Sequence, residues 1–230
     1  MNKQQLTDAF GWDVKNWSRT IPFWEKHLNF SKLQNSRSLE IGCRFGGLSL
    51  FLALEGSQVL CTDLIDPDEK TRQIHYKHGV SDKVSYQSMD VLDIPFENEF
   101  DIICFKSVLG GVGRQGRSDL QQKAIEQIHQ ALKPGGVLLF AENLKASTFH
   151  QAMRKKFVQW GDEWNYPTLS EIKSLCSEFD ETQLSTGGFL GAFGRSNKQR
   201  NALATLDRAL DKLTSPSQRY VCFGFAKKQK

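Results

Sequence analysis

Ser38-Leu39-Glu40-Ile41-Gly42-Cys43-Arg44-Phe45-Gly46-Gly47 is the stretch that decides the fold of this chain. It has the pattern of a buried strand with an acid near its end, a glycine turn, and a helix that begins at Gly46–Leu48. Glycine has no side chain, so such a turn lets the polar groups of a ligand approach the main chain closely. The N–H groups of the helix start also point towards a ligand there. We therefore expect a small-molecule cofactor at this turn.

Apolar runs and helical segments alternate along the rest of the chain. Helices are expected at 48–55, 66–79 and 118–132. Strands are expected at 39–41, 58–62, 83–87, 100–105, 137–141, 180–186 and 220–226. The central strands are apolar on both faces, which is typical of a parallel sheet covered by helices. The sequence therefore predicts an α/β fold with a doubly wound, mostly parallel sheet and helices on both faces.

Residues 10–30 precede the first strand and have apolar side chains at helical spacing. Val14, Trp17, Ile21, Trp24 and Leu28 are three or four residues apart, which places them on one helix face. We expect two short extra helices, which either pack on the flank of the domain or cover the cofactor. A chain of 230 residues without a linker suits one domain. Its expected parts are an N-terminal helical lid at 1–36, a cofactor-binding core at 37–142, and the substrate side with the closing strands at 143–230.

The composition disfavours several other classes of protein. A net charge of +4 is mildly basic and does not by itself indicate a nucleic-acid partner. The apolar runs are too short to cross a bilayer, and no signal-peptide core follows the first residues. The five cysteines are scattered without a CxxC pair, which favours reduced buried thiols over zinc. We expect a cytoplasmic protein with no metal and no membrane span, and its oligomeric state stays open.

Acidic residues follow three successive strands of the predicted sheet. Ligands of open parallel sheets bind beyond the carboxyl ends of the strands, where Glu40, Asp63 and Asp90 fall. An acid after the second strand is well placed to accept both hydroxyls of a ribose, and a charged acceptor makes the stronger hydrogen bonds. Asp90 either contacts a base or only caps its own loop. The next strand ends carry Lys106 with Ser107 and Glu142 with Asn143.

At these residues the chain resembles the class I methyltransferases that use S-adenosylmethionine. The resemblance covers residues 38–142 and rests on four motifs in the family's order: Glu40–Gly47, Cys61-Thr62-Asp63-Leu64, Met89-Asp90-Val91, and Leu132-Lys133-Pro134-Gly135-Gly136 before an apolar strand. It implies a seven-stranded sheet in which only the last strand runs antiparallel. The strand at 220–226 fits that last position.

The resemblance also implies roles for individual residues. Gly42 and Gly46 would pack against the methionine portion and the sugar of the cofactor, and Glu40 would lie near its amino group. Asp63 would hold the ribose hydroxyls. Asp90 would meet the adenine amino group, and Val91 would donate its main-chain N–H to the ring. The remaining predicted cofactor contacts are Cys43, Leu64 and Lys106.

Arg44 is the one departure from the family pattern, which usually has glycine at this position between Gly42 and Gly46. It places a cation either near the cofactor or out in solvent. A dinucleotide oxidoreductase is the rival for any glycine turn after a strand, but it requires G-x-G-x-x-G. The spacing here is Gly42-x-x-x-Gly46-Gly47, which favours the methyltransferase.

The acceptor of the methyl group is narrowed by motifs that the sequence lacks. The Asn/Asp-Pro-Pro-aromatic tetrapeptide of enzymes that methylate nucleobase amines is missing after the fourth strand, where Lys106-Ser107-Val108-Leu109 stands. There is no Pro-Cys pair for attack on a pyrimidine carbon. These absences favour a small molecule over DNA. The last third vaguely resembles methyltransferases of bacterial surface-polysaccharide gene clusters, and we lean towards O-methylation of a saccharide or a related polar metabolite.

The substrate side is expected to carry aromatic and charged groups. A hydroxyl acceptor benefits from a base, and the candidates are Glu142 at a strand end and His150, whose ordinary pKa suits that role. The structural alternative, a capping or surface histidine, stays open. Further substrate contacts are expected from Asn143, Arg154, Trp160, Trp164 and Tyr166, with the two tryptophans also candidates for the core.

Two other functions remain as alternatives. The chain would be an RNA methyltransferase if its cations formed a phosphate track, the candidates being Arg114, Arg117, Arg154, Lys155 and Lys156. It would be a non-catalytic partner subunit if it bound the cofactor without turnover.

Overall fold

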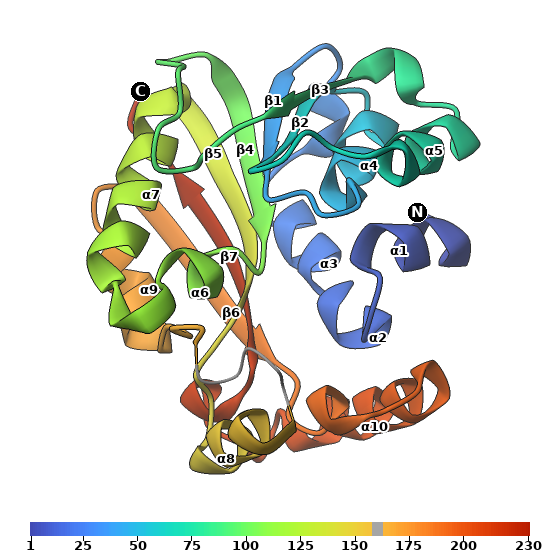
Figure 1. Cartoon of the computed structure of the whole chain (residues 1–230), viewed down its shortest axis with the longest axis vertical. Coiled ribbons are helices and arrows are strands. Elements are labelled where there is room, and N and C mark those ends of the chain that lie inside the picture. Colours follow the sequence, from blue (N-terminus) through green and yellow to red (C-terminus); the bar gives the residue numbers. More distant parts are fainter. Residues whose placement is uncertain (158–162) are drawn as a thin grey trace.

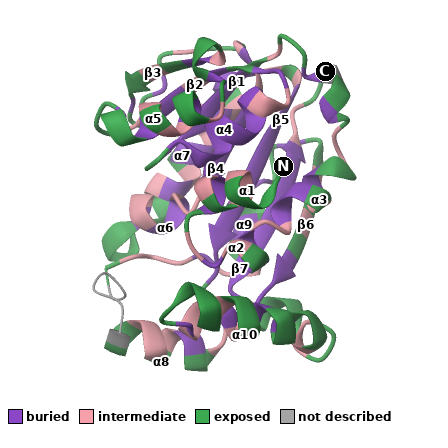
Figure 2. Ribbon diagram, turned by 90° about the vertical axis from the view of Figure 1, so that its right-hand side faces the viewer, coloured by how far each residue is buried: buried purple, intermediate pink, exposed green. Residues whose placement is uncertain are grey.

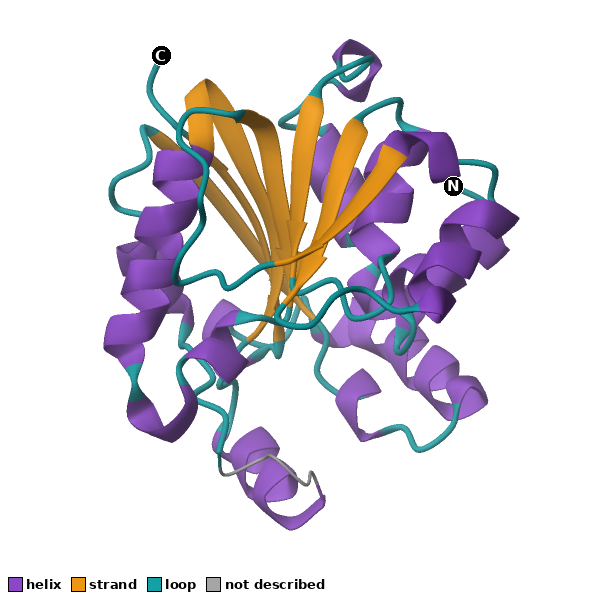
Figure 3. Ribbon diagram, turned by 45° about the horizontal axis from the view of Figure 1, so that its top comes forward, coloured by secondary structure: helices purple, strands orange, loops and turns teal. Residues whose placement is uncertain are grey.

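The computed structural model describes residues 1–157 and 163–230, which form a seven-stranded sheet with helices on both faces (Figure 1, Figure 3). The strand order is β3-β2-β1-β4-β5-β7-β6. The strands are β1 (Arg37–Ile41), β2 (Gln58–Asp63), β3 (Val84–Ser88), β4 (Phe100–Lys106), β5 (Leu132–Asn143), β6 (Glu181–Gly187) and β7 (Val221–Lys227). β7 is antiparallel to β5 and β6, whereas β1 to β5 pair in parallel. The predicted fold class is confirmed, including the direction of the last strand.

The helices connect the strands in the alternating order that the sequence predicts. They are α1 (Lys3–Phe10), α2 (Val14–Trp17), α3 (Thr20–Glu25), α4 (Gly47–Leu54), α5 (Glu69–Lys77), α6 (Leu109–Val112), α7 (Ser118–Ala131), α8 (Thr148–Phe157), α9 (Leu169–Leu175) and α10 (Asn197–Leu210). In the described part of the chain, no helix is both long and apolar enough to span a bilayer.

Two apolar clusters form the core, one on each face of the sheet, because side chains alternate along each strand. On β4, Ile102 and Cys104 join the cluster that lies against α1, α3 and α4. Ile103 and Phe105 join the other cluster, against α7 and α9. The central strands β1, β4 and β7 are almost continuously buried, while the edge strands β3 and β6 and the outer sides of α5 and α10 are partly exposed (Figure 2). This two-sided burial explains why the strands read as unbroken apolar runs.

The N-terminal segment packs on the sheet face that carries α4. Trp24 of α3 is fully buried and its Nε1 donates to the carbonyl of Gly224 in β7, at 2.8 Å. At the other end of the segment, the carbonyl of Ala9 lies 1.9 Å from the position that a Cβ on Gly47 would take. α3 therefore packs on the flank of the domain and α1 ends against the glycine turn, while a role of this segment in covering the cofactor stays a prediction.

A buried polar network ties α2 to the C-terminal third. The side-chain amide of Asn16 donates to Asp207 of α10 at 2.8 Å and lies 2.9 Å from the hydroxyl of Tyr220. The Tyr220 hydroxyl also donates to the Asp13 carboxylate. Burial raises the pKa of Asp13 to about 6. α2 is thereby held against α10, beyond the carboxyl ends of the parallel strands (Figure 1).

The start of α5 differs from the prediction. The helix begins at Glu69, and the capping side chain is Asp68, which accepts from the N–H of Thr71 at 3.0 Å. Asp66, the first residue of the predicted helix, lies before the observed start and pairs with Arg72. Aspartate suits an N-cap because its side chain accepts from the free N–H groups of the first turn, and the sequence offers two of them two residues apart.

Candidate cofactor and acceptor site

The turn after β1 uses left-handed backbone at three positions. Gly42, Arg44 and Gly46 have φ values of 64°, 52° and 70°. For a residue with a Cβ, this region of backbone conformation costs about 1–2 kcal/mol. At position 44, the glycine of the family pattern would avoid this cost. Arg44 adopts the conformation of that glycine, and its exposed guanidinium lies 5.2 Å from the ring of Phe45. The departure therefore preserves the shape of the turn.

Glu40 lies beneath this turn and supports it. Its two carboxylate oxygens accept from the N–H of Leu48 at 3.1 Å and of Ser49 at 2.7 Å. They satisfy donors of the first turn of α4, whose N-cap residue is a glycine without a side chain. The side chain is buried, and this burial raises the pKa of Glu40 to about 7. Glu40 thus supports the shape of the turn, and its place near the amino group of the cofactor stays a prediction.

The two outer glycines of the turn are required by the protein's own packing. A Cβ on Gly42 would lie 2.7 Å from a methyl group of Val108, and one on Gly46 would lie 2.5 Å from the ring of His75. His75 is fully buried, and its Nε2 lies 2.8 Å from the carbonyl of Gly46. Its Nδ1 lies 2.7 Å from the hydroxyl of Tyr86. His75 is a supporting residue that the sequence reasoning missed.

The predicted ribose and adenine residues lie together at the ends of β2 and β3. The N–H of Met89 donates to the carbonyl of Asp63 at 2.7 Å and joins the two strand ends. Asp63 accepts from the N–H of Arg44 and of Leu64, at 2.8 Å each, through different oxygens. Asp90 is exposed and caps its own loop by accepting from the N–H of Leu92 at 2.9 Å, and its contact to the adenine stays a prediction.

Two of the remaining predicted contacts are buried at the same edge. Cys43 is 6% exposed, and its N–H donates to the carbonyl of Thr62 at 2.9 Å. Val91 is also 6% exposed and packs in the core. Leu64 and its neighbour Ile65 are by contrast 70% and 81% exposed. Their apolar surface lies directly beside Asp63.

Lys106 ends β4 between Glu40 and Glu142. Its Nζ donates to the carbonyl of Phe10, the last residue of α1, at 2.9 Å. The same atom lies 5.1 Å from the ring of Trp17. Burial lowers the pKa of Lys106 to about 8, against the opposing effect of the two glutamates. Lys106, which the sequence predicts to contact the cofactor, therefore holds the end of α1 over this edge of the sheet.

Both predicted bases are buried and are engaged by the protein's own groups. Glu142 is fully buried and accepts from the N–H groups of Val108, Leu109 and Asn143, at 2.8 Å each. Burial raises its pKa to about 7. The glutamate is thus the anchor of the loop that leads into α6, because it takes up donors that the helix start leaves unpaired.

His150 lies away from the strand ends, in an aromatic cluster with Phe189, Phe193 and Tyr220. Its Nε2 is 2.8 Å from the carbonyl of Phe189, and its Nδ1 is 2.7 Å from the hydroxyl of Ser147. Burial lowers the pKa of the imidazole to about 4. His150 is thus a buried packing residue in the structure, and its role as a base stays a prediction.

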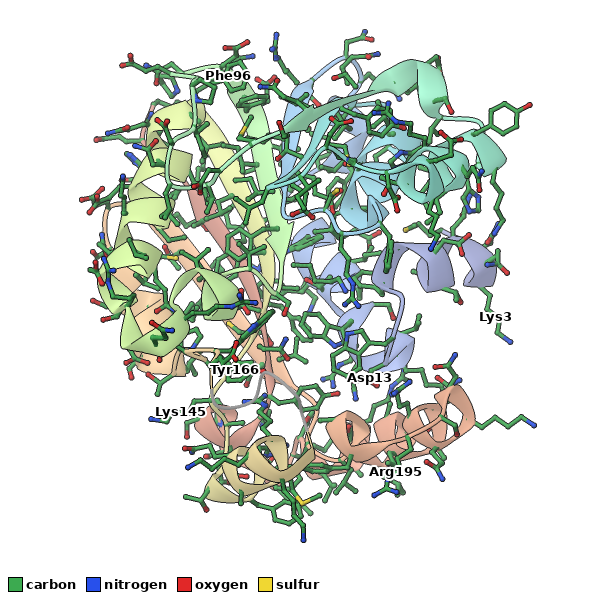
Figure 4. The ribbon with its side chains drawn as sticks, viewed as in Figure 1. Lys3, Asp13, Phe96, Lys145, Tyr166 and Arg195 are labelled. Atoms are coloured by element: carbon green, nitrogen blue, oxygen red, sulfur yellow. The ribbon has the colours of Figure 1, made fainter. Side chains whose placement is uncertain are left out.

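The other predicted substrate residues gather beyond β5. The side-chain amide of Asn143 donates to the hydroxyl of Ser107 at 2.7 Å. Arg154 of α8 stacks on Tyr166, with its guanidinium carbon 4.1 Å from the ring centre. Trp164 packs against Gly110, where an added Cβ would lie 2.9 Å from its ring. Figure 4 labels Tyr166 and Lys145 on this side of the molecule. Trp160 lies outside the described residues.

The residues present fit a nucleoside cofactor. A carboxylate offers about four acceptor positions, and Asp63 uses two of them within the protein. The exposed leucine and isoleucine beside it offer an apolar surface to a base, and such exposed apolar groups commonly mark a binding site. In the described part of the chain, no three His, Cys, Asp or Glu side chains converge as a metal site.

Comparison with known proteins supports the assignment. Residues 39–140 match a family model described as methyltransferase domain. A carboxy-S-adenosyl-L-methionine synthase from Hydrogenovibrio crunogenus is 29% identical over 114 residues, 48% of this chain and 43% of that protein. A sarcosine/dimethylglycine N-methyltransferase from Aphanothece halophytica is 24% identical over 113 residues, 48% of this chain and 39% of its own length. The matched region therefore spans less than half of each relative.

Solved structures share the fold over nearly the whole chain. A putative sarcosine dimethylglycine methyltransferase from Galdieria sulphuraria superposes with a TM-score of 0.61 and 14% identity, covering 92% of this chain and 86% of that one. Phosphoethanolamine N-methyltransferase 2 from Haemonchus contortus, in complex with S-adenosyl-L-methionine, gives 0.60 and 17%, covering 93% and 53%.

The match of residues 39–140 to a methyltransferase domain and the shared fold support the class I methyltransferase that the sequence predicts. S-adenosylmethionine is the cofactor of this class, and the prediction of both from the sequence is confirmed. The resemblance to polysaccharide-cluster enzymes stays a prediction.

Proposed function

We propose that this chain transfers the methyl group of S-adenosylmethionine to a small amine. The observation that carries the proposal is that both predicted bases are buried and engaged within the protein. Both ring nitrogens of His150 lie within hydrogen-bond distance of the protein's own groups, and Glu142 accepts from three main-chain N–H groups. A saccharide hydroxyl, the acceptor favoured by the sequence, needs help in losing its proton. A neutral amine already has a free electron pair and needs positioning instead.

The bound cofactor would supply an electrophilic methyl group on a positively charged sulfur. The amine nitrogen would form the new bond to carbon, the bond from carbon to sulfur would break, and its electron pair would stay on the sulfur. The methylated ammonium product then loses a proton to water. The chain's part is to bind and orient: Asp63 and Leu64 would hold the nucleoside, and the turn from Gly42 to Gly46 would support the methionine portion.

The relatives support an amine acceptor. N-methylation is the reaction in the name of the Aphanothece halophytica relative and of the Haemonchus contortus structure. The RNA alternative receives no such support. Two cations of its expected track are engaged elsewhere, because Arg117 pairs with Asp119 and Arg154 donates to the carbonyl of Leu144. The domain parts, with a helical lid at 1–36, also remain a proposal.

The test is transfer of a labelled methyl group to a panel of primary and secondary amines, nucleotide sugars, lipid-linked saccharides and total RNA. Mass spectrometry of the products identifies the methylated atom. We expect label on nitrogen of small amines, lost in Asp63→Ala. Label confined to saccharide hydroxyls or to RNA would refute the proposal. Binding of S-adenosylhomocysteine without turnover on any acceptor would indicate the non-catalytic alternative.

A further inference from the structure

Arg154 is a guanidinium held in a fixed position beyond the end of β5. Its Nη1 donates to the carbonyl of Leu144 at 2.7 Å and to that of Lys145 at 3.3 Å. The planar group stacks on the ring of Tyr166 at 4.1 Å. Stacking and two carbonyl contacts fix both its place and its plane, which suits recognition of a planar or tetrahedral anion.

No acid neutralises Arg154 within residues 1–157 and 163–230, where its contacts are with carbonyls and an aromatic ring. Burial lowers the pKa of Arg154, and Tyr166, Tyr220 and Glu142 oppose this effect. Glu142 itself is engaged with three main-chain N–H groups. A largely buried cation without a carboxylate partner is costly, which points to an anion supplied from outside the chain.

The guanidinium also keeps donors for such an anion. Nε and Nη2 of Arg154 make no hydrogen bond to the described residues. They also differ from Nη1 of Arg19, which is fully enclosed by the protein and lacks a partner. They therefore face accessible space. Arginine offers donors in a fork that matches the two oxygens of a carboxylate or phosphate.

A second polar group stands close by along the chain. Asn143 precedes the two residues whose carbonyls hold Arg154, and its amide nitrogen is turned towards Ser107. The other side of that amide is an oxygen acceptor, suited to the N–H of an amine. The two groups are therefore both tied to the short stretch that follows β5.

From these contacts we propose that Arg154, stacked on Tyr166, binds an anionic group on the acceptor, a carboxylate or a phosphate. The acceptor would then be an amine that carries an acid, with its nitrogen on the Asn143 side. This inference rests on the proposed function, since it names the substrate class of the same site.

The test measures binding, so that it reads the anion site even without turnover. Protein saturated with S-adenosylhomocysteine is titrated by calorimetry with matched probes: sarcosine against sarcosine amide, and phosphoethanolamine against ethanolamine. We expect wild type to bind at least one anionic probe about 10-fold or more tightly than its neutral partner, as charge-assisted hydrogen bonds allow. Which pair shows the difference distinguishes carboxylate from phosphate. Arg154→Gln should abolish the difference, and Arg154→Lys should retain part of it.

Arg114→Gln is the matched control, because Arg114 is an exposed arginine of the loop after α6 and should leave the difference intact. Equal binding of both probes by wild type would overturn the inference. So would an equal difference in wild type and Arg154→Gln, with unchanged melting temperature. Anion-selective binding without methyl transfer to any amine would retain the anion site and reject the proposed function. Failure to bind S-adenosylhomocysteine at all would overturn both.

Discussion

The main-chain N–H of Arg44 donates to the carboxylate of Asp63 at 2.8 Å, and this bond joins the turn after β1 to the acid that ends β2. It needs the left-handed backbone of residue 44 but not its side chain. The two parts of the cofactor site that the sequence places 19 residues apart are thereby fixed relative to each other. Arg44 takes part through its backbone, which is why the family's glycine and this arginine are both compatible with the turn.

Arg44→Gly should therefore preserve the turn and relieve its strain. We expect Arg44→Gly to be more stable than Arg44→Ala by about 1 kcal/mol, since alanine keeps the cost of positive φ. Urea denaturation of both variants gives this difference, and both should bind S-adenosylhomocysteine as wild type does. A glycine variant less stable than the alanine variant would show that the conformation of residue 44 is not strained.

Gly47→Ala should disturb the packing of α1 against the start of α4. The added methyl group would meet the Ala9 carbonyl at 1.9 Å, and overpacking of this kind typically costs about 1–3 kcal/mol. Gly111→Ala is the matched control. Gly111 lies in the short helix α6, and a Cβ added there would make an ordinary contact with Trp164 at 3.5 Å. We expect lower stability and faster proteolysis of residues 1–25 in Gly47→Ala alone. Equal behaviour of the two variants would mean that α1 does not depend on this contact.

His150→Gln tests whether His150 is a buried, neutral residue, through the pH dependence of the free energy of unfolding. The folded pKa of about 4 is below the ordinary 6.5, so the unfolded chain takes up a proton that the native state refuses. The contribution of neutral His150 to the free energy of unfolding is therefore fully present above pH 6.5 and is lost as the pH falls towards 4. Between pH 7 and pH 5, the wild-type advantage over His150→Gln should shrink by about 2 kcal/mol.

Urea denaturation of both proteins at the two pH values measures this change. Folded His150→Gln should still transfer methyl groups, because the imidazole has no access to the acceptor. A constant stability difference across this pH range would argue that His150 titrates normally, and loss of activity in the folded variant would restore it as a base.

The sequence predicts the sheet and the cofactor side well because these depend on local patterns. The apolar runs at 58–62 and 137–141 are buried on both faces, so their pattern alone identifies them as inner strands. Asp63 directly follows such a run, and the carboxyl end of a parallel strand is where ligands bind.

The acceptor side is less predictable because its residues are decided by distant partners. His150 is kept neutral by burial and its Nε2 is engaged by the carbonyl of Phe189, 39 residues away, and Glu142 is engaged by amides 33 and 34 residues earlier. No local pattern reveals these partners. His75 has a weak signal in the sequence, because it lies four residues after Thr71 and so on the same helix face. The side chains of both residues lie next to Gly46.

The most direct test of the cofactor site is calorimetric titration of S-adenosylhomocysteine into wild type and Asp63→Ala. Asp63→Asn serves as the second variant, since it retains an oxygen acceptor for the N–H of Arg44 while losing the charge. The account predicts one site in wild type, with affinity reduced about 10-fold or more in Asp63→Ala and to a lesser degree in Asp63→Asn, as expected for loss of charged hydrogen bonds. Equal affinity in wild type and a folded Asp63→Ala would contradict it.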